Sequence, residues 1–149
     1  MNATAAKLER RLARRILVID DNLDNVRSLA LLFHAMGHHV DYAINATAAA
    51  DMAVSMKPDV IFLDVLLPDG HGANVCKEIR RHSALKRTRI YGVTGSPRMF
   101  DLQLALDAGC DDVLRKPVSS ETFERLIAGG MHRRKLRDSI ADKSKDTQR

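Results

Sequence analysis

The sequence predicts an α/β domain with a doubly wound parallel sheet of five strands in the order 2-1-3-4-5. The first observation is the apolar run Val60–Leu63, which leads into Asp64 and then into a turn that contains Pro and Gly. Such a run is typical of a strand buried on both faces, as the strands of parallel sheets are. The second observation is the alternation of strand and helix patterns along the chain. Because crossovers are right-handed, few topologies remain, and the chosen order places the first and third strands side by side.

The first half of the chain is predicted to form two strands and two helices before the central strand. Arg15–Ile19 is a short apolar run, and Asn22–Met36 has apolar residues three and four apart, as amphipathic helices do. His39–Ala43 alternates apolar and polar residues, which indicates a strand near the edge of the sheet. Ala46–Met56 has helical spacing again, and a proline two residues further on ends that helix.

The second half continues the same alternation. The predicted elements are a helix at Ala73–Arg81, a polar and basic connection at 82–88, a strand at Arg89–Val93, a helix from Gly95 to about Ala108, a strand at Asp112–Arg115 and a last helix after Ser119. In the helix before the last strand, Leu102, Ala105 and Leu106 are expected to be buried. Ser119 suits a helix N-terminus because its hydroxyl can accept a hydrogen bond from a free backbone N–H group.

Length and composition predict one globular domain with a basic extension at each end. Of the 149 residues, 45% are hydrophobic and 29% are charged, as in ordinary globular proteins. We expect a basic extension at residues 1–13, one domain at 14–130 and a basic extension at 131–149 that is too short for an output domain. The longest uninterrupted apolar run has five residues, so we expect no membrane span and a cytoplasmic location.

Basic residues are concentrated in the two extensions. Residues 1–15 and 131–149 each carry a net charge of +4, whereas residues 16–130 carry a net charge of −3. The extensions lack aromatic residues that could stack on bases, so we interpret them as solvated segments and do not expect nucleic acid as a main partner. Accessory binding of nucleic acid through these extensions is the alternative.

The cysteines and histidines do not have the spacing of a metal site. Cys76 and Cys110 are expected to be reduced, buried thiols. His34, His38 and His39 lie at the end of the first predicted helix, where a cation that interacts with the helix dipole is the expected role.

Polar residues follow four of the predicted strands at the point where each strand ends. Asp20 and Asp21 follow the first strand, Asp64 closes the third, Thr94 follows the fourth and Lys116 follows the fifth. Because the carboxyl ends of parallel strands share one edge of the sheet, we expect these side chains to gather there. Neighbouring carboxylates raise one another's pKa unless a cation lies among them, and a ligand set of oxygens alone favours Mg²⁺. A carboxylate beside such an ion can act as a nucleophile toward a phosphoryl group, with the Lys and Thr side chains stabilising the transferred charge.

Residues 14 to about 128 resemble the receiver domain of bacterial two-component response regulators, in particular the stand-alone chemotaxis receivers. The motifs that carry the resemblance are Ile19-Asp20-Asp21, Leu63-Asp64 with Pro68 and Gly70, Val93-Thr94-Gly95, and Lys116-Pro117. The resemblance implies a flavodoxin-like fold of five βα units, with the strand order already chosen.

The resemblance also implies roles for the residues that match these motifs. Asp64 is expected to be the phosphoacceptor and to bind Mg²⁺ directly, together with Asp21 and the backbone carbonyl of Leu66, while Asp20 holds the ion largely through water.

Two further roles concern the phosphoryl group. Thr94 is expected to donate its hydroxyl to one phosphoryl oxygen and Lys116 to pair with another. The bond between Lys116 and Pro117 is expected to be cis, which only proline permits at low cost. Gly95 is expected to leave a gap through which the phosphoryl donor approaches.

A sensor histidine kinase is the partner that the resemblance implies, with a histidine phosphotransfer protein and a second copy of the chain, as a homodimer, as further expected partners. Such a domain is not an enzyme in the usual sense; it accepts and loses a phosphoryl group and signals by changing conformation or by passing the group on in a phosphorelay. The chain departs from the family at Val113, where receivers usually have a Tyr or Phe that turns inward as a switch. We therefore expect phosphorylation without the usual aromatic readout.

A small phosphatase of the haloacid dehalogenase kind is the alternative from another functional class. Those enzymes also use an Asp nucleophile after a strand, but they place a second Asp two residues later, where this chain has Leu66. The first strand is not followed by a P-loop or a Gly-rich dinucleotide fingerprint, so nucleotide binding is not predicted.

Overall fold

The computed structural model describes residues 3–4, 12–67, 72–96 and 98–129 of the chain. The predicted turn at 68–71, Pro97 and most of the two basic extensions lie outside the described residues.

The sheet has the predicted strands and the predicted order. Its strands are β1 (Arg15–Ile19), β2 (His39–Ala43), β3 (Val60–Asp64), β4 (Arg89–Thr94) and β5 (Asp112–Arg115). All pairs are parallel, and the order across the sheet is β2-β1-β3-β4-β5. The central position of β3 explains its sequence, because residues with neighbours on both sides and helices on both faces are cut off from water. Residues 60 to 63 of this strand are accordingly buried.

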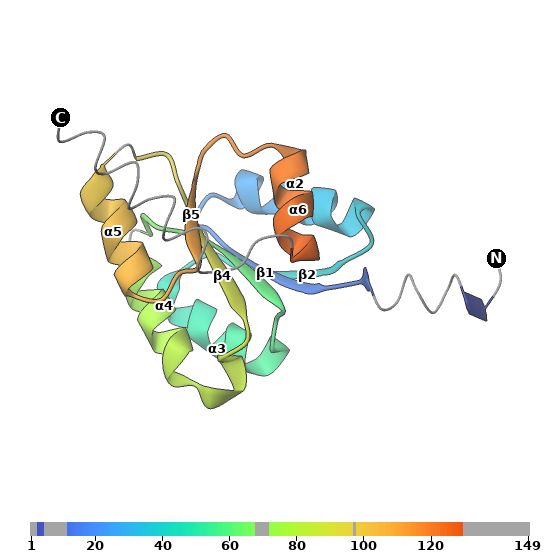
Figure 1. The fold of residues 1–149 in the computed structure, drawn as a ribbon, viewed down its shortest axis with the longest axis horizontal. Coiled ribbons are helices and arrows are strands. Elements are labelled where there is room, and N and C mark those ends of the chain that lie inside the picture. Colours follow the sequence, from blue (N-terminus) through green and yellow to red (C-terminus); the bar gives the residue numbers. More distant parts are fainter. Residues whose placement is uncertain (1–2, 5–11, 68–71, 97, 130–149) are drawn as a thin grey trace.

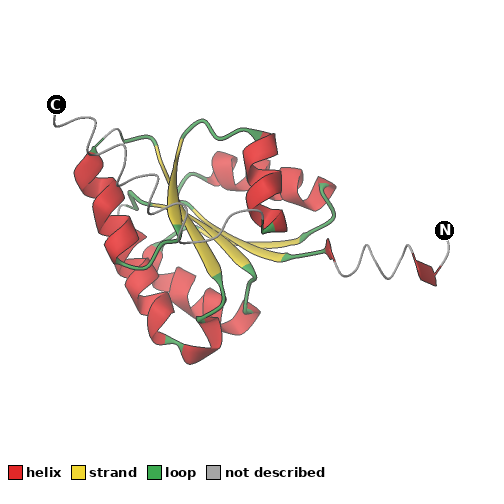
Figure 2. Cartoon of the chain, viewed as in Figure 1, coloured by secondary structure: helices red, strands yellow, loops and turns green. Residues whose placement is uncertain are grey.

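The helices cover both faces of the sheet (Figures 1 and 2). They are α2 (Leu23–Ala35), α3 (Ala46–Met56), α4 (Gly72–Arg81), α5 (Met99–Asp107) and α6 (Ser120–Ala128), with a short 3-10 helix η1 (Ser83–Leu85) before β4. Helices α2 and α6 lie on one face, and α3, α4 and α5 lie on the other (Figure 1). The doubly wound α/β fold predicted from the sequence is confirmed.

Polar side chains begin three of these helices. Asn22 caps α2 by accepting from the backbone N–H of Asn25, and Asn45 caps α3 in the same way. Ser119 accepts from the N–H of Thr122 and caps α6, as predicted. Each cap satisfies a donor that the first helical turn leaves without a partner, which contributes about 1 kcal/mol.

Two details of the helices differ from the prediction. The helix after β4 begins at Met99 rather than at Gly95, and its Leu102 is only partly buried, whereas Ala105 and Leu106 are buried as expected. The connection at 82–88, predicted to be polar, contains η1 and the fully buried Leu85. A single large apolar residue in a polar segment produces no periodic pattern, so the sequence could not reveal that Leu85 is buried.

The two faces of the sheet are packed with different kinds of side chain. Between the sheet and the helices α2 and α6, four aromatic rings form a contiguous cluster in which ring centroids are 5.0 to 5.7 Å apart: Phe33, Phe62, Tyr91 and Phe123. The opposite face is packed mainly by alanine and branched aliphatic side chains. Each aromatic pair adds about 0.5 to 1.5 kcal/mol beyond the burial of its area.

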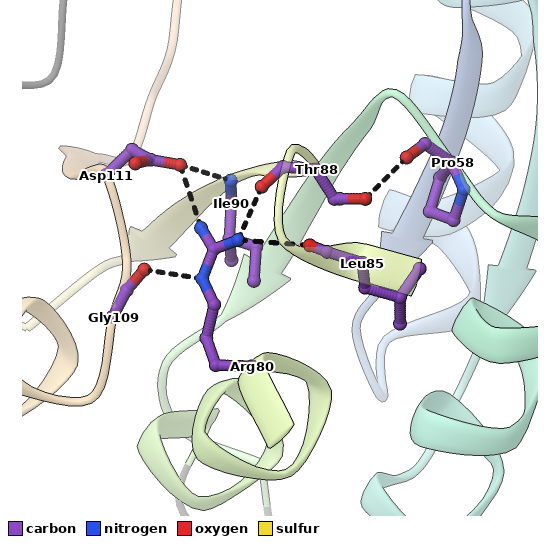
Figure 3. A network of polar contacts seen from close by, with 7 residues as sticks. All are labelled: Pro58, Arg80, Leu85, Thr88, Ile90, Gly109 and Asp111. Atoms are coloured by element: carbon purple, nitrogen blue, oxygen red, sulfur yellow. Dashed lines mark hydrogen bonds and ion pairs between the residues drawn. The ribbon is translucent and has the colours of Figure 1, made fainter. Parts of the chain in front are cut away.

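Arg80 in the last turn of α4 connects this helix with the start of β4 and the loop before β5, at the edge of the sheet where the strands begin (Figure 3). Its guanidinium donates to the backbone carbonyls of Gly109 at 3.0 Å and Thr88 at 2.6 Å, and to the carboxylate of Asp111 at 3.0 Å. The same Asp111 oxygen accepts the backbone N–H of Ile90 at 2.8 Å. The network therefore fixes the end of α4 against the start of β4 and the loop before β5.

Candidate functional site

The acidic residues predicted to form the site meet where β1 and β3 end. Ile19 pairs with Leu63 in the sheet, so Asp20 and Asp64, the residues that follow each of them, leave neighbouring strands at the same level. A carboxylate oxygen from Asp20, from Asp21 and from Asp64 can be found within 4.8 Å of one another. The prediction that topology brings these three side chains together is confirmed.

Lys116 reaches this acidic group from the end of β5. Its ammonium lies 3.3 Å from Oδ2 of Asp20 and 3.7 Å from Oδ2 of Asp64. The other oxygen of each carboxylate accepts a backbone N–H two residues further along the chain, from Asn22 and from Leu66, at 2.9 Å in both cases. Asp20 and Asp64 are thus oriented alike: one carboxylate oxygen accepts a backbone N–H, and the other points toward the Lys116 ammonium. The direct contact of Lys116 with Asp20 was not predicted from the sequence.

The environment of Asp64 favours its neutral form when no further cation is present. Burial is the largest influence and raises the pKa of the Asp64 carboxyl above its ordinary value. The N–H of Leu66 and the ammonium of Lys116 lower this pKa, whereas the neighbouring Asp20 raises it. The Leu66 N–H and the Lys116 ammonium together thus do not offset the effect of burial on the pKa of this carboxyl.

A divalent cation fits this set of residues. The donors are carboxylate oxygens on one edge of the sheet, and one of them, Asp21, is exposed and leaves room for water. Mg²⁺ prefers a few carboxylate oxygens and keeps several of its waters. Among the described residues these aspartates form the one acidic or histidine-rich group that could hold an ion.

Thr94 is at the same edge of the sheet, and its hydroxyl contacts the loop after β4. Its side chain is fully buried at the end of β4, and its hydroxyl oxygen accepts the backbone N–H of Ser96 at 3.0 Å. The hydroxyl of Ser96 in turn donates to Asp101 in the first turn of α5, at 3.1 Å. Asp101 was not singled out from the sequence because an acidic residue in a first helical turn is ordinary. The structure shows that it is buried and orients the loop after β4.

The segment after Lys116 forms one wall of a cavity beside the site. The peptide bond between Lys116 and Pro117 is cis, as the resemblance implied. A cavity of about 420 Å³ opens between α2 and the start of α6, next to Asp20, Asp64 and Lys116. The apolar side chains that line it are Val18, Ile19, Leu29, Phe62, Val93, Pro117, Val118 and Phe123. The acidic group therefore lies at the mouth of an apolar hollow.

Two other positions considered from the sequence are also placed by the structure. A Cβ atom added to Gly95 would meet no atom within 4 Å, which agrees with an open approach beside Thr94. Val113 is half-buried and packs against the face of the core that contains α3, α4 and α5.

The cysteines behave as predicted, but one histidine does not. Cys76 and Cys110 are free, buried thiols, and the neighbouring Cys76 and burial raise the pKa of Cys110. His38, predicted as a cation at a helix end, accepts the backbone N–H of Arg14 on Nδ1 at 2.9 Å. Burial and the nearby Arg14 lower the pKa of His38, so the neutral form is favoured and that prediction is wrong.

The sheet is doubly wound, and three carboxylates and a lysine meet at its switch point. These features define a class of α/β domains that have an acidic site, suited to a metal ion, at the switch point of the sheet. Comparison with known proteins identifies the family: residues 16–128 match the response regulator receiver domain, and the chain belongs to that family. Receiver domains are in general signalling domains of two-component systems rather than enzymes. The haloacid dehalogenase alternative is therefore set aside.

Several curated relatives contain a similar segment. The signal transduction histidine-protein kinase BarA of Shigella flexneri is 29% identical over 119 residues, which cover 80% of this chain and 13% of that protein. The BarA protein of Escherichia coli strain K12 matches with the same values. The chain thus spans about one eighth of the length of these relatives, and their activity as whole proteins does not transfer to it.

Solved structures with the same fold are also receivers. A two-component response regulator from Clostridium difficile is 33% identical, with a TM-score of 0.69 over 76% of this chain and 93% of that one. The chemotaxis protein CheY4 of Vibrio cholerae is 25% identical, with a TM-score of 0.72 over 77% and 96% of the two chains. The receiver domain of the sensor histidine kinase PA1611 of Pseudomonas aeruginosa, 26% identical with a TM-score of 0.71 over 77% and 94%, has a magnesium ion in its active site cleft.

Within the described part of the chain, every helix is too short or too polar to cross a membrane.

Proposed function

We propose that this chain accepts a phosphoryl group on Asp64 from the phosphohistidine of a sensor histidine kinase. The observation that carries the proposal is the meeting of Asp20, Asp21 and Asp64 within 4.8 Å, with the Lys116 ammonium 3.7 Å from Asp64. This arrangement unites a nucleophile, a set of metal ligands and a fixed cation, which are the parts that phosphoryl transfer requires.

In the proposed reaction, a carboxylate oxygen of Asp64 forms a bond to phosphorus while the bond between phosphorus and the donor imidazole nitrogen breaks. The electron pair of the broken bond stays on the imidazole. Lys116 offsets charge on one phosphoryl oxygen, and the Thr94 hydroxyl donates to another after it leaves its contact with the Ser96 N–H.

Mg²⁺ is the proposed cofactor of this step. Asp21, Asp64 and the backbone carbonyl of Leu66 would hold the ion directly, and Asp20 would hold it largely through water. The bound ion supplies positive charge to the phosphoryl oxygens as the group is transferred. Support comes from the oxygen-only ligand set and from the magnesium ion in the PA1611 receiver domain.

Labelling with a small phosphoryl donor tests the proposal. Incubation with acetyl phosphate and Mg²⁺ should add the mass of one phosphoryl group, and Asp64→Asn should abolish the addition. Asp107→Asn is the matched control, because Asp107 is an exposed aspartate that accepts a hydrogen bond from the Gln103 side chain in the same helix. Equal labelling of Asp64→Asn and the unaltered chain would refute the assignment of Asp64.

We further propose that phosphorylation alters the surface that a partner contacts. The phosphoryl group brings about 1.5 to 2 negative charges to the edge of the sheet, which shifts the balance between two conformations of the loops and helices around it. Val113 replaces the usual aromatic switch, so the change is transmitted by aliphatic packing next to β4. A homodimer and a histidine phosphotransfer protein are the proposed partners. Sedimentation with and without beryllofluoride tests dimer formation, since an unchanged sedimentation coefficient at saturating beryllofluoride would exclude a dimer driven by phosphorylation.

A further inference from the structure

The hydroxyl of Thr94 is joined to the start of α5 by a short chain of hydrogen bonds. The Thr94 oxygen accepts the backbone N–H of Ser96 at 3.0 Å. The Ser96 hydroxyl donates to Oδ2 of Asp101 at 3.1 Å and accepts the backbone N–H of Arg98 at 3.2 Å. Ser96 therefore connects a residue at the end of β4 with a carboxylate in the first turn of the next helix.

This arrangement differs from the usual cap at the start of a helix. In a capping box, a Glu or Gln at the third helical position accepts the backbone N–H of the N-cap residue directly. Here Arg98 is the N-cap residue and Asp101 is the third residue of α5, and the Ser96 hydroxyl lies between them. The carboxylate of Asp101 is thus bound to the segment that follows β4, in addition to its favourable place near the positive end of the helix dipole.

Both ends of this chain of contacts are withdrawn from water. Thr94 is fully buried, and Asp101 is 8% exposed. Because a carboxylate is costly to bury unless its oxygens have hydrogen-bond donors, Asp101 favours conformations in which the Ser96 hydroxyl keeps its contact. Ser96 itself is half-buried. The position of the Ser96 backbone N–H, which the Thr94 oxygen accepts, is therefore fixed from the side of the helix.

These contacts bear on the phosphoryl transfer proposed above. Within the described part of the chain, the Thr94 hydroxyl is hydrogen-bonded to Ser96 and not to Asp64. In the proposed reaction, the hydroxyl gives up the Ser96 N–H when it donates to a phosphoryl oxygen on Asp64. That N–H then lacks an acceptor in a half-buried segment unless Ser96 moves as well. Ser96 moves only when its hydroxyl leaves Asp101, so the carboxylate opposes the change at Thr94.

We propose that Asp101 is a positioning residue that acts through Ser96 and holds Thr94 in the conformation without a phosphoryl group. The strength of the contact between Ser96 and Asp101 then sets the population of the conformation that accepts the group. This consequence rests on the proposed phosphoryl transfer at Asp64, whereas the coupling of Asp101 to Thr94 does not. A carboxylate that served only the helix dipole would stabilise α5 without any effect on Thr94.

The first test measures the χ1 rotamer of Thr94 by NMR in the full chain, without metal or phosphoryl donor, from the three-bond couplings of its methyl carbon to the backbone. We expect one rotamer in the unaltered chain and exchange between rotamers in Asp101→Ala. One rotamer should return in Asp101→Asn, because the amide oxygen still accepts the Ser96 hydroxyl. Asp107→Ala is the matched control and should leave Thr94 unchanged, because Asp107 is exposed at the other end of the same helix. An unchanged single rotamer in Asp101→Ala would overturn the proposal.

The second test titrates the same variants with beryllofluoride and Mg²⁺. Asp101→Ala should bind this mimic roughly 3- to 10-fold more tightly than the unaltered chain, because the contact that opposes the change is gone. Asp101→Asn and Asp107→Ala should stay within about twofold of the unaltered chain. The double variant Ser96→Ala/Asp101→Ala should bind no more tightly than Asp101→Ala alone, since both changes remove one and the same contact.

Unchanged or weaker binding by Asp101→Ala would overturn the proposal, and so would additive effects of the two substitutions. Circular dichroism shows whether each variant is folded, and Ser96→Ala, which removes the other partner of the contact, replaces Asp101→Ala in both tests if the latter is unfolded. If the unaltered chain does not bind the mimic, the proposed phosphoryl transfer at Asp64 fails, and the rotamer of Thr94 alone decides whether Asp101 positions it.

Discussion

Replacement of Arg80 by methionine should destabilise the domain more than any exposed arginine would. Methionine keeps most of the aliphatic stem but removes a guanidinium that donates to the carbonyls of Gly109 and Thr88 and to the carboxylate of Asp111. The side chains of Arg80 and Asp111 are only 16% and 10% exposed, so water cannot fully replace the lost donors. Removing one partner of a buried ion pair costs about 3 to 5 kcal/mol, and the remaining access of water favours the lower end, about 3 kcal/mol.

Urea unfolding followed by circular dichroism measures this loss. With a slope of about 2 kcal/mol per molar urea, the midpoint should fall by about 1.5 M. Arg81→Met is the control at the next position, because the side chain of Arg81 is 79% exposed and its one ion pair, with Glu78, lies on the helix surface. Its effect should stay within about 0.5 kcal/mol. A loss below about 1 kcal/mol for Arg80→Met, or equal losses at both positions, would refute the view that this network holds the strand starts together.

Three further predictions concern the acidic site. In Mg²⁺-free buffer with EDTA, Asp64→Asn should stabilise the fold at neutral pH, because the raised pKa of Asp64 means that its ionised form costs free energy in the folded state. Urea unfolding measures this gain in the free energy of unfolding. The gain should vanish below the ordinary pKa of aspartate, where Asp64 is protonated in both the folded and the unfolded state. Lys116→Met should raise the pKa of Asp64 further by removing the cation that lowers it, and a carboxyl-carbon NMR titration that shows no upward movement would contradict this. Gly72→Ala should cost about 1 to 3 kcal/mol in thermal unfolding, because its Cβ would lie 2.5 Å from the Asp64 carbonyl oxygen; an unchanged melting temperature would mean that α4 shifts freely.

The sheet could be predicted from the sequence because its strands are short apolar runs with clear ends. Val60–Asp64 has the pattern of a buried parallel strand, and the structure gives it these bounds. Once the order of the strands is fixed, topology alone brings Asp20 and Asp64 together, so the position of the acidic site followed from pattern and handedness.

The sequence could not predict polar contacts that leave no periodic pattern along the chain. Arg80 at the end of a helix looks like any solvated basic residue, yet most of its partners are backbone carbonyls, which the side-chain pattern does not display. The contact between Ser96 and Asp101 depends in the same way on the path of one loop. The pairing of Lys116 with Asp20 arises from residues 96 positions apart, whose distance is set only when the whole sheet has formed.

The ring cluster on the α2 and α6 side also determines what spectroscopy can observe in this molecule. The chain has no tryptophan and two tyrosines, of which Tyr91 is 1% exposed within the cluster and Tyr42 is 45% exposed. The near-ultraviolet dichroism of the folded chain must therefore arise chiefly around Tyr91. Separation of α2 or α6 from the sheet would remove this signal, whereas loosening of α3, α4 or α5 would leave the near-ultraviolet signal largely unchanged and would have to be followed through methyl resonances.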